Sequence, residues 1–266
     1  MGQLELGALG QVRFDTTGQG TAVIFLHSGL TDGRQWDGQV AALSSRYLCV
    51  RADMPGFGGS SDPGELFDPT QVVFSLMDHL GIERAHIVGS SMGGSTALHA
   101  AVQNPKRVAS LFLAGTGMFG YTFAAPEPPP IYHQYEQAYQ ARDVFNAVRC
   151  GEVIWLWGIS GSEACVSTPV KQHFEQMNRE YYVNHFWQGP KYLPINDALQ
   201  IGDLAMPVMM VIGDKDTPYC LSLAEHLRAR IPHNVLRFIP GAAHFPNLTH
   251  PCIFNAWLLQ WLAEHD

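Results

Sequence analysis

The sequence predicts an α/β fold, in which a mostly parallel central sheet is flanked by helices and a helical lid is inserted. Short apolar runs alternate with stretches of helical periodicity, which is the pattern of a layered fold with right-handed crossovers. The alternation stops after Ala114 and resumes at Pro207, which indicates an inserted segment. A Gly-x-Ser-x-Gly run at residues 89–93 joins one apolar run directly to a helical stretch. These three observations predict the fold class.

The expected strands and helices follow in order along the chain. Two early runs separated by glycine-containing turns, residues 4–6 and 12–15, are expected to form an antiparallel hairpin at one edge of the sheet. The later runs are almost continuously apolar, as strands buried on both faces are, and comprise residues 22–26, 47–51, 86–88, 110–114, 208–212 and 235–239. The helical stretches between and after them are residues 35–43, 70–80, 92–103, 221–230 and 253–264.

The inserted segment is rich in aromatic residues. We expect residues 118–203 to form a helical lid, and residues 1–117 and 204–266 to form the core. Residues 118–200 hold 15 of the 29 aromatic residues, which favours an apolar lid over a linker, although the aromatics of a subdomain can also fill only its own small core. The candidates to face a substrate are Tyr121, Tyr132, Tyr135, Trp155, Trp157, Tyr182, Phe186 and Trp187. Of these, Trp155 and Trp187 are predicted to bind substrate.

Composition limits the kind of partner. The formal net charge of −8 argues against a nucleic-acid binder that works through a basic surface, so a small-molecule substrate is expected. No uninterrupted apolar stretch reaches about 18 residues and no signal peptide is visible, so we expect no membrane insertion and a cytoplasmic location. The five cysteines are scattered without a C-x-x-C pair, which argues against a zinc site or a disulfide framework. We expect no metal and no cofactor, and the oligomeric state stays open.

The Gly-x-Ser-x-Gly run predicts a catalytic serine at Ser91. A nucleophile on a strand-to-helix turn has a strained backbone, and small residues two positions to either side let the chains pass without a clash. The N-terminus of the following helix also favours the negative charge that develops there. Ser90 is a poorer candidate, because Val88 and Met92 would take the places of the two glycines.

A serine hydroxyl needs a base that takes its proton, and a carboxylate that holds the base. His244 is the best-placed histidine, because it follows the last expected strand and so lies at the same edge of the sheet as Ser91. Asp214 and Asp216 both follow the expected strand at residues 208–212. We prefer Asp216, because it is further from the strand end and precedes a turn-forming Thr-Pro pair.

The oxyanion of the transition state needs backbone donors. One is expected to be the N–H of Met92, and the other should come from the loop after residues 22–26. Gly29 is our choice there, ahead of Ser28 and Leu30, which we predict to contact the substrate. His27 is expected to order this loop through hydrogen bonds. The glycine-containing residues 53–61 lack the third glycine of a dinucleotide fingerprint and are expected to form a tight structural loop.

Motifs over nearly the whole chain resemble those of the α/β-hydrolase fold superfamily. Residues 27–29 are similar to its H-G-x oxyanion loop, 53–60 to its D-x-P-G-x-G-x-S loop, and 89–93 to its nucleophile elbow. Residues 213–216 and 241–244 are similar to its G-x-x-D and G-x-x-H motifs, which supports Asp216 over Asp214. The resemblance implies that residues 118–203 are the helical cap of the family. Ser28 departs from the pattern, because glycine is usual there.

The resemblance implies a hydrolase but does not fix its substrate. Dehalogenases and epoxide hydrolases of this fold resemble each other in carrying an aspartate at the elbow, and Ser91 argues against both. Hydrolases of meta-cleavage products usually have a glycine-rich oxyanion loop, which this chain lacks. We therefore expect hydrolysis of a small carboxylic ester or lactone with an apolar acyl part through an acyl-enzyme. A C–C bond hydrolase or lyase with the same triad, and a slow or non-catalytic ligand receptor, are the alternatives.

Overall fold

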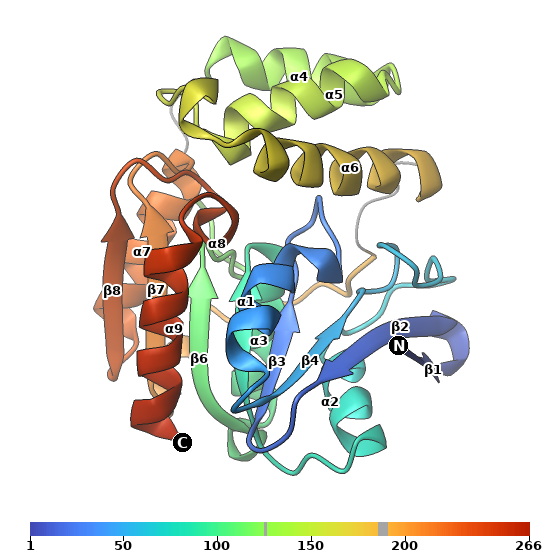
Figure 1. Ribbon diagram of the computed structural model, residues 1–266, viewed down its shortest axis with the longest axis vertical. Helices are drawn as coiled ribbons and strands as arrows, with labels where there is room; N and C mark the ends of the chain where they lie inside the picture. The colour runs from blue at the N-terminus through green and yellow to red at the C-terminus, as the bar shows by residue number, and fades with distance from the viewer. Residues whose placement is uncertain (125–126, 186–190) are drawn as a thin grey trace.

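The computed structural model describes residues 1–124, 127–185 and 191–266, and its centre is an eight-stranded sheet (Figure 1). The strand order is β1-β2-β4-β3-β5-β6-β7-β8. β1 pairs with β2, and β2 with β4, in antiparallel fashion, whereas all other neighbours are parallel. The strands are β1 (Gly2–Glu5), β2 (Gln11–Thr17), β3 (Ala22–Leu26), β4 (Leu48–Ala52), β5 (Ala85–Ser90), β6 (Val108–Ala114), β7 (Val208–Gly213) and β8 (Asn234–Ile239). The predicted mostly parallel sheet with a hairpin at one edge is confirmed.

Each central strand sends alternate side chains to two separate apolar layers. In β3, Val23 and Phe25 pack in one cluster with the helices α1 (Asp37–Leu43) and α9 (Pro251–His265). The neighbouring Ile24 and Leu26 pack in a second cluster, which holds α2 (Thr70–His79), α3 (Met92–Gln103) and α7 (Pro218–Arg230). Because both faces of the sheet are covered, these strands are apolar along their whole length, which is why the sequence marks them so clearly.

Two helices begin earlier than the sequence pattern predicts. α7 begins at Pro218 rather than at residue 221, and α9 begins at Pro251 rather than at residue 253. Both helices have proline in their first turn, where the missing N–H needs no partner. A 3-10 turn (Gly33–Trp36) precedes α1 where one continuous helix was expected, and α8 (Pro246–Thr249) precedes α9.

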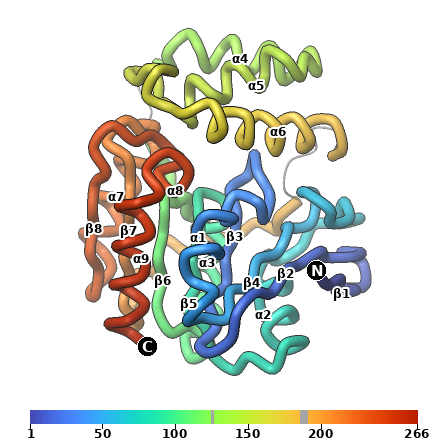
Figure 2. Tube along the Cα trace, in the orientation of Figure 1, coloured from blue at the N-terminus to red at the C-terminus, as the bar shows by residue number. Residues whose placement is uncertain are grey.

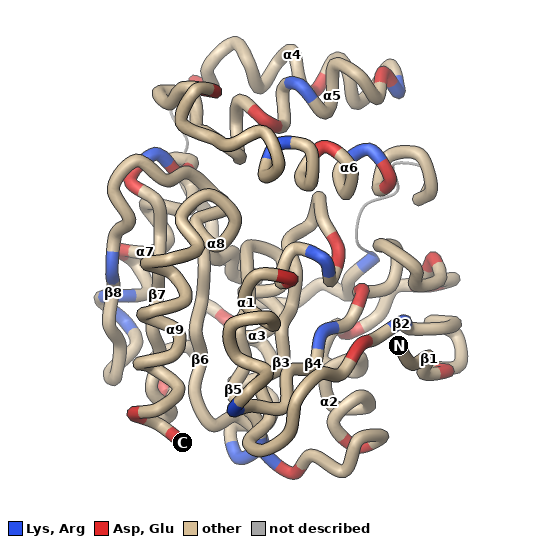
Figure 3. Tube along the Cα trace, viewed as in Figure 1, with Lys and Arg blue, Asp and Glu red and all other residues tan. Residues whose placement is uncertain are grey.

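In residues 118–203, which we call the cap segment, the described part of the chain forms three α-helices beyond the C-terminal ends of the parallel strands (Figures 1 and 2). They are α4 (Pro130–Gln140), α5 (Val144–Gly151) and α6 (Thr168–Asn184), and a π-helical turn (Glu152–Leu156) continues α5. Charges of both signs alternate along α6 (Figure 3). Of the predicted substrate contacts, Trp187 lies outside the described residues, as does Phe186. Within the described part of the chain, each helix is too short or too polar to cross a membrane.

Candidate active site

Ser91 occupies a strained turn between β5 and α3. Its φ of 51° and ψ of −111° lie outside the regions that residues with a side chain ordinarily adopt. The flanking glycines explain how the chain passes this point. A Cβ atom on Gly93 would lie 2.1 Å from the carbonyl oxygen of Leu26, and one on Gly89 would lie 2.5 Å from the carbonyl oxygen of Gly93. The structure therefore has the backbone geometry that the Gly-x-Ser-x-Gly run predicts.

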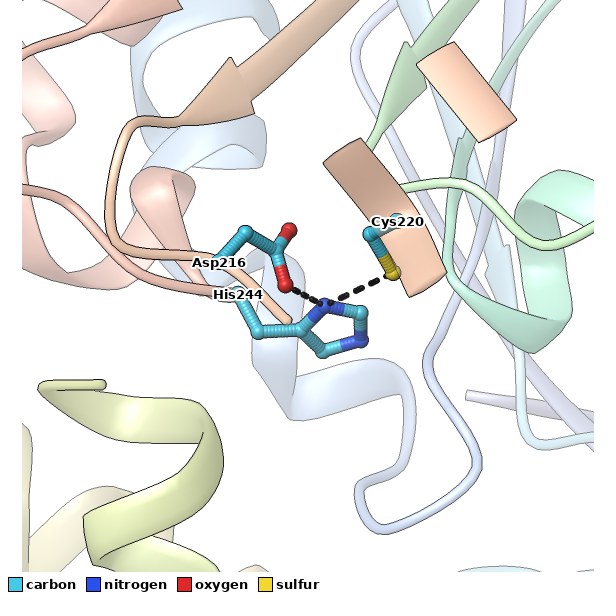
Figure 4. A group of neighbouring side chains, drawn as sticks. All are labelled: Asp216, Cys220 and His244. Carbon is cyan, nitrogen blue, oxygen red and sulfur yellow. Dashed lines mark hydrogen bonds and ion pairs between the residues drawn. The ribbon is translucent and has the colours of Figure 1, made fainter. Parts of the chain in front are cut away.

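The structure brings Asp216 and His244 together (Figure 4). The Nδ1–H of His244 donates to Oδ1 of Asp216 over 2.9 Å, because a carboxylate only accepts. Asp216 also accepts from the backbone N–H of Thr217 over 2.6 Å, and its side chain is fully buried. Asp214 is exposed instead, and its Oδ1 accepts from the backbone N–H of Gly241. Of the two candidate aspartates, only Asp216 contacts the histidine.

Burial and the neighbouring Asp216 carboxylate shift the pKa of His244 in opposite directions. Burial alone would lower the pKa of His244, but the adjacent Asp216 carboxylate outweighs it, so the pKa lies well above its ordinary value. The hydrogen bond to Asp216 keeps one proton on Nδ1, and a neutral ring then has its lone pair on Nε2. An imidazole in this tautomer can accept a proton from a hydroxyl through Nε2.

Ser91 and His244 line one cavity of about 500 Å³. Its wall combines side chains from the core with side chains from the cap segment, and Trp155 is among the latter. The lining residues are Ser91, Gly117, Phe123, Pro128, Pro129, Tyr132, Trp155, Thr217, Pro218, Tyr219, Cys220 and His244. The backbone carbonyl of Trp155 also accepts from the N–H of His244 over 3.0 Å, so the cap segment contacts the histidine loop directly.

The loop after β3 lies beside the N-terminus of α3. A Cβ atom on Gly29 would lie 3.8 Å from both Cβ and Sδ of Met92, so the two expected oxyanion donors belong to neighbouring segments. The N–H of Ser28 already donates to Oε1 of Gln35 over 2.9 Å. The carbonyl oxygen of Leu30 accepts from Nδ2 of Asn178 on α6 over 3.2 Å.

Two of the predicted substrate contacts do not line the cavity. Ser28 is buried within its own loop, and Leu30 packs against the larger apolar cluster. Neither residue is among those that surround the cavity within the described part of the chain. Both residues lie in the loop as expected, but the N–H of Ser28 binds Gln35 and the carbonyl oxygen of Leu30 binds Asn178 on α6.

We expected His27 to order the loop after β3 through hydrogen bonds, and residues 53–61 to form a tight structural loop. Both expectations are confirmed. His27 accepts from the backbone N–H of Met54 through Nε2 over 2.9 Å, and its Nδ1 lies 2.8 Å from the carbonyl oxygen of Ser28. Burial lowers the pKa of His27, so the ring is neutral with its proton on Nδ1. In the loop at residues 53–61, Asp53 accepts from the N–H groups of Gly33 and Gly59, each over 2.8 Å.

Sequence reasoning missed several residues around the cavity. Cys220 lies 3.7 Å from Nδ1 of His244 through its Sγ, and Thr217 and Tyr219 also line the cavity. The Thr-Pro pair after Asp216 carries a signal for them, because Thr217 caps α7 and so places Cys220 in its first turn. The contact between Cys220 and His244 depends on the position of α7 relative to the loop that carries His244, which no local pattern specifies.

Comparisons with known proteins show that the chain is similar to hydrolases of known fold. Residues 21–150 match the protein-family model described as "alpha/beta hydrolase fold". A 2-hydroxy-6-oxo-6-phenylhexa-2,4-dienoate hydrolase of Comamonas testosteroni is 37% identical over 125 residues, which span 44% of each chain. A 2-hydroxy-6-oxononadienedioate/2-hydroxy-6-oxononatrienedioate hydrolase of Cupriavidus pinatubonensis is 26% identical over 267 residues, covering 96% of this chain and 91% of the relative.

A solved structure supports the fold independently. The thermophilic esterase of Thermogutta terrifontis superposes with a TM-score of 0.77 at 21% sequence identity, covering 96% of this chain and 94% of the esterase. At this identity the likeness is one of fold. The arrangement of sheet and helices around Ser91 is thus shared with known hydrolases.

Proposed function

Because the chain belongs to the α/β-hydrolase fold superfamily, we propose that it is a serine hydrolase with Ser91, His244 and Asp216 as its catalytic triad. The observation that carries this proposal is the shared cavity, which Ser91 and His244 both line while Asp216 binds Nδ1 of the imidazole. Asp216 fixes the tautomer that leaves a lone pair on Nε2. It also stabilises the imidazolium that forms when His244 accepts the proton of Ser91.

The oxyanion is stabilised by backbone donors in this proposal. Attack of Ser91 on a carbonyl group places a negative oxygen near the start of α3, where the N–H of Met92 belongs to the first turn. Gly29 provides the second N–H from the neighbouring loop. The α4, α5 and α6 helices of the cap segment act as a lid, since Tyr132 and Trp155 reach the cavity from that side.

We infer that the bond cleaved is a C–C bond next to a ketone. The support comes from relatives aligned over nearly the whole chain, whose names describe hydrolysis of 2-hydroxy-6-oxo dienoic acids. In such a compound the conjugated chain can accept the electron pair of the broken bond. Ser91 would take the acyl group, the His244 imidazolium would protonate the departing carbon, and water would then release a carboxylic acid. This replaces ester hydrolysis, our expectation from the sequence, as the leading reaction.

Hydrolysis of an ester or lactone with an apolar acyl part is the second candidate, and the cavity favours it. Among the described residues that line the cavity, none is lysine, arginine, aspartate or glutamate. A substrate carboxylate would therefore rely on neutral donors, of which Tyr132, Thr217 and Tyr219 carry hydroxyl groups. An uncharged ester needs no such partner.

The two reactions are separated by comparing kcat/KM for a vinylogous diketone acid with that for p-nitrophenyl acetate. C–C hydrolysis predicts that the diketone acid is the better substrate, and the opposite ratio would favour the esterase. Replacing Ser91 by Ala should lower kcat for either substrate by several orders of magnitude, on the order of 10⁶. A Ser91→Ala variant that kept most of the activity would contradict the proposed nucleophile.

A further inference from the structure

Three potential metal ligands of different chemistry lie close together on the Nδ1 side of the His244 ring (Figure 4). They are a carboxylate oxygen of Asp216, Sγ of Cys220 and Nδ1 of His244, and all lie within 4.8 Å of one another. Nδ1 of His244 is 2.9 Å from Oδ1 of Asp216 and 3.7 Å from Sγ of Cys220. Ligand atoms around a tetrahedral zinc ion are roughly 3.3–3.6 Å apart at ordinary bond lengths. The cluster is therefore close to the spacing that zinc requires.

A second observation indicates that this position has unused binding capacity. Within the described residues, Oδ2 of Asp216 is buried and has no hydrogen-bond partner. A buried carboxylate oxygen ordinarily has one. Gly115 lies directly beside this oxygen, and a Cβ atom there would crowd both the oxygen, at 2.9 Å, and Nδ1 of His244, at 3.0 Å.

Two of the three ligand residues border the proposed substrate cavity. Cys220 and His244 both line that cavity, whereas Asp216 lies behind them. The donor set of thiol, imidazole and carboxylate suits a soft or borderline divalent ion such as zinc or cadmium, and not magnesium or calcium. We propose that Asp216, Cys220 and His244 form an inhibitory site for a thiophilic divalent metal ion, through which such an ion reversibly switches the hydrolase off.

The inhibition follows from the tautomer of the imidazole. A metal ion on Nδ1 displaces the proton that Nδ1 now donates to Asp216. A neutral ring must then carry its proton on Nε2. That nitrogen then has no lone pair with which to accept the proton of Ser91. The thiol loses its proton to solvent when it ligates the metal. Binding should therefore weaken as the pH falls.

The inhibitory effect rests on the proposed triad, but metal binding can be measured without turnover. Cadmium bound to a thiolate gives an ultraviolet charge-transfer absorption. The parent protein for this test carries Cys165→Ser and Cys252→Ser, because these two cysteines are exposed and would bind cadmium themselves. Titration with cadmium chloride should give an absorption that saturates at one ion per chain. Adding Cys220→Ser or Cys220→Ala, in separate folded variants, should abolish it.

Activity provides the second measurement. Zinc chloride should inhibit hydrolysis of p-nitrophenyl acetate by the parent, and a chelator should restore it. In the Cys220 variants the inhibition constant should rise at least tenfold, with each variant compared with its own metal-free rate. An absorption that is absent from the parent, or unchanged without Cys220, would overturn the metal site. A Cys220-dependent absorption in a protein that turns over neither p-nitrophenyl acetate nor the diketone acid would uphold the metal site and contradict the proposed function.

Discussion

The turn at Ser91 shows how a short sequence pattern specifies a whole local geometry. The pattern predicts a serine whose flanking glycines allow the backbone to pack closely. A Cβ atom added to either glycine would lie within 2.5 Å of a backbone atom. The strained φ of 51° follows from the same turn. The turn can be predicted because its serine and both glycines lie within five residues of sequence, although the Leu26 carbonyl that Gly93 packs against belongs to a distant strand.

Other features of the site cannot be predicted in this way. The Thr-Pro pair favours Asp216 over Asp214, but no local pattern shows that His244 reaches Asp216 from another loop. The approach of Cys220 to the same ring likewise depends on where α7 begins. Ser28 and Leu30 were expected to contact substrate, but tertiary partners on Gln35 and Asn178 engage their backbone groups.

The elevated pKa of His244 predicts how activity depends on pH. His244 must be neutral to accept a proton, so kcat/KM should rise with pH through an apparent pKa above the ordinary histidine value. Replacing Asp216 by Asn removes the carboxylate that raises this pKa, so the rise should move to lower pH. The rate should also fall by about 10⁴, because the wrong tautomer is favoured. A rise that stays in place in Asp216→Asn would contradict this account.

At the scale of elements, α6 contacts the loop that follows β3. Nδ2 of Asn178 donates to the carbonyl oxygen of Leu30, and Nε2 of His173 lies 3.1 Å from the carbonyl oxygen of Arg34. Arg34 also forms an ion pair with Glu180 on the same helix. Because Gly29 lies in this loop, the cap segment can influence the geometry of the proposed oxyanion donor.

Replacing Asn178 by Ala should therefore affect catalysis as well as stability. The substitution leaves the Leu30 carbonyl without its donor, and the expected loss is about 1–3 kcal/mol in the free energy of unfolding. If the loop shifts, kcat should fall more than KM rises. The matched control is Glu180→Gln, which weakens a partly exposed ion pair and should change the free energy of unfolding by at most about 1 kcal/mol. Equal kinetic effects of both substitutions would contradict a specific role for Asn178.

Sequence patterns predicted the core elements better than the cap segment. Strands such as β3 and β7 are buried throughout and are continuously apolar, so their position in the chain is unambiguous. In α6 polar residues predominate, and its buried side chains, such as Phe174 and Tyr181, contact both the cap segment and the core. The aromatic content of the cap segment gave no basis for distinguishing Trp155, which lines the cavity, from Tyr182, which is buried outside it.

At the scale of the whole molecule, a buried histidine links three elements on one side of the sheet. His86 on β5 lies 2.8 Å from Oγ of Ser110 on β6 through its Nδ1, and the same hydroxyl oxygen accepts from Nε1 of Trp261 on α9 over 3.0 Å. Burial lowers the pKa of His86 to about 4. The folded protein therefore holds this ring neutral at pH values where an unfolded chain would protonate it.

His86 should make the protein sensitive to mild acid. Between its unfolded pKa of about 6.5 and its folded pKa of about 4, the unfolded chain binds more protons, so the free energy of unfolding falls as the pH falls. The contribution is fully present above that window, and about 1–2 kcal/mol of it should be lost at about pH 5. Urea unfolding of the wild type and of His86→Leu at neutral and acid pH measures this effect. Parallel pH profiles for the two proteins would exclude His86 as the cause.

The central claim is that Ser91 is a nucleophile activated by His244 and Asp216 within one cavity. Labelling with a fluorophosphonate, followed by mass spectrometry of the peptides, tests this claim most directly, because the reagent reacts with an activated serine whatever the natural substrate is. The account predicts one label on the peptide that contains Ser91 in the wild type, and none in folded His244→Ala. A folded wild-type protein that takes up no label, or takes it up at another serine, would contradict the claim and would favour a ligand receptor.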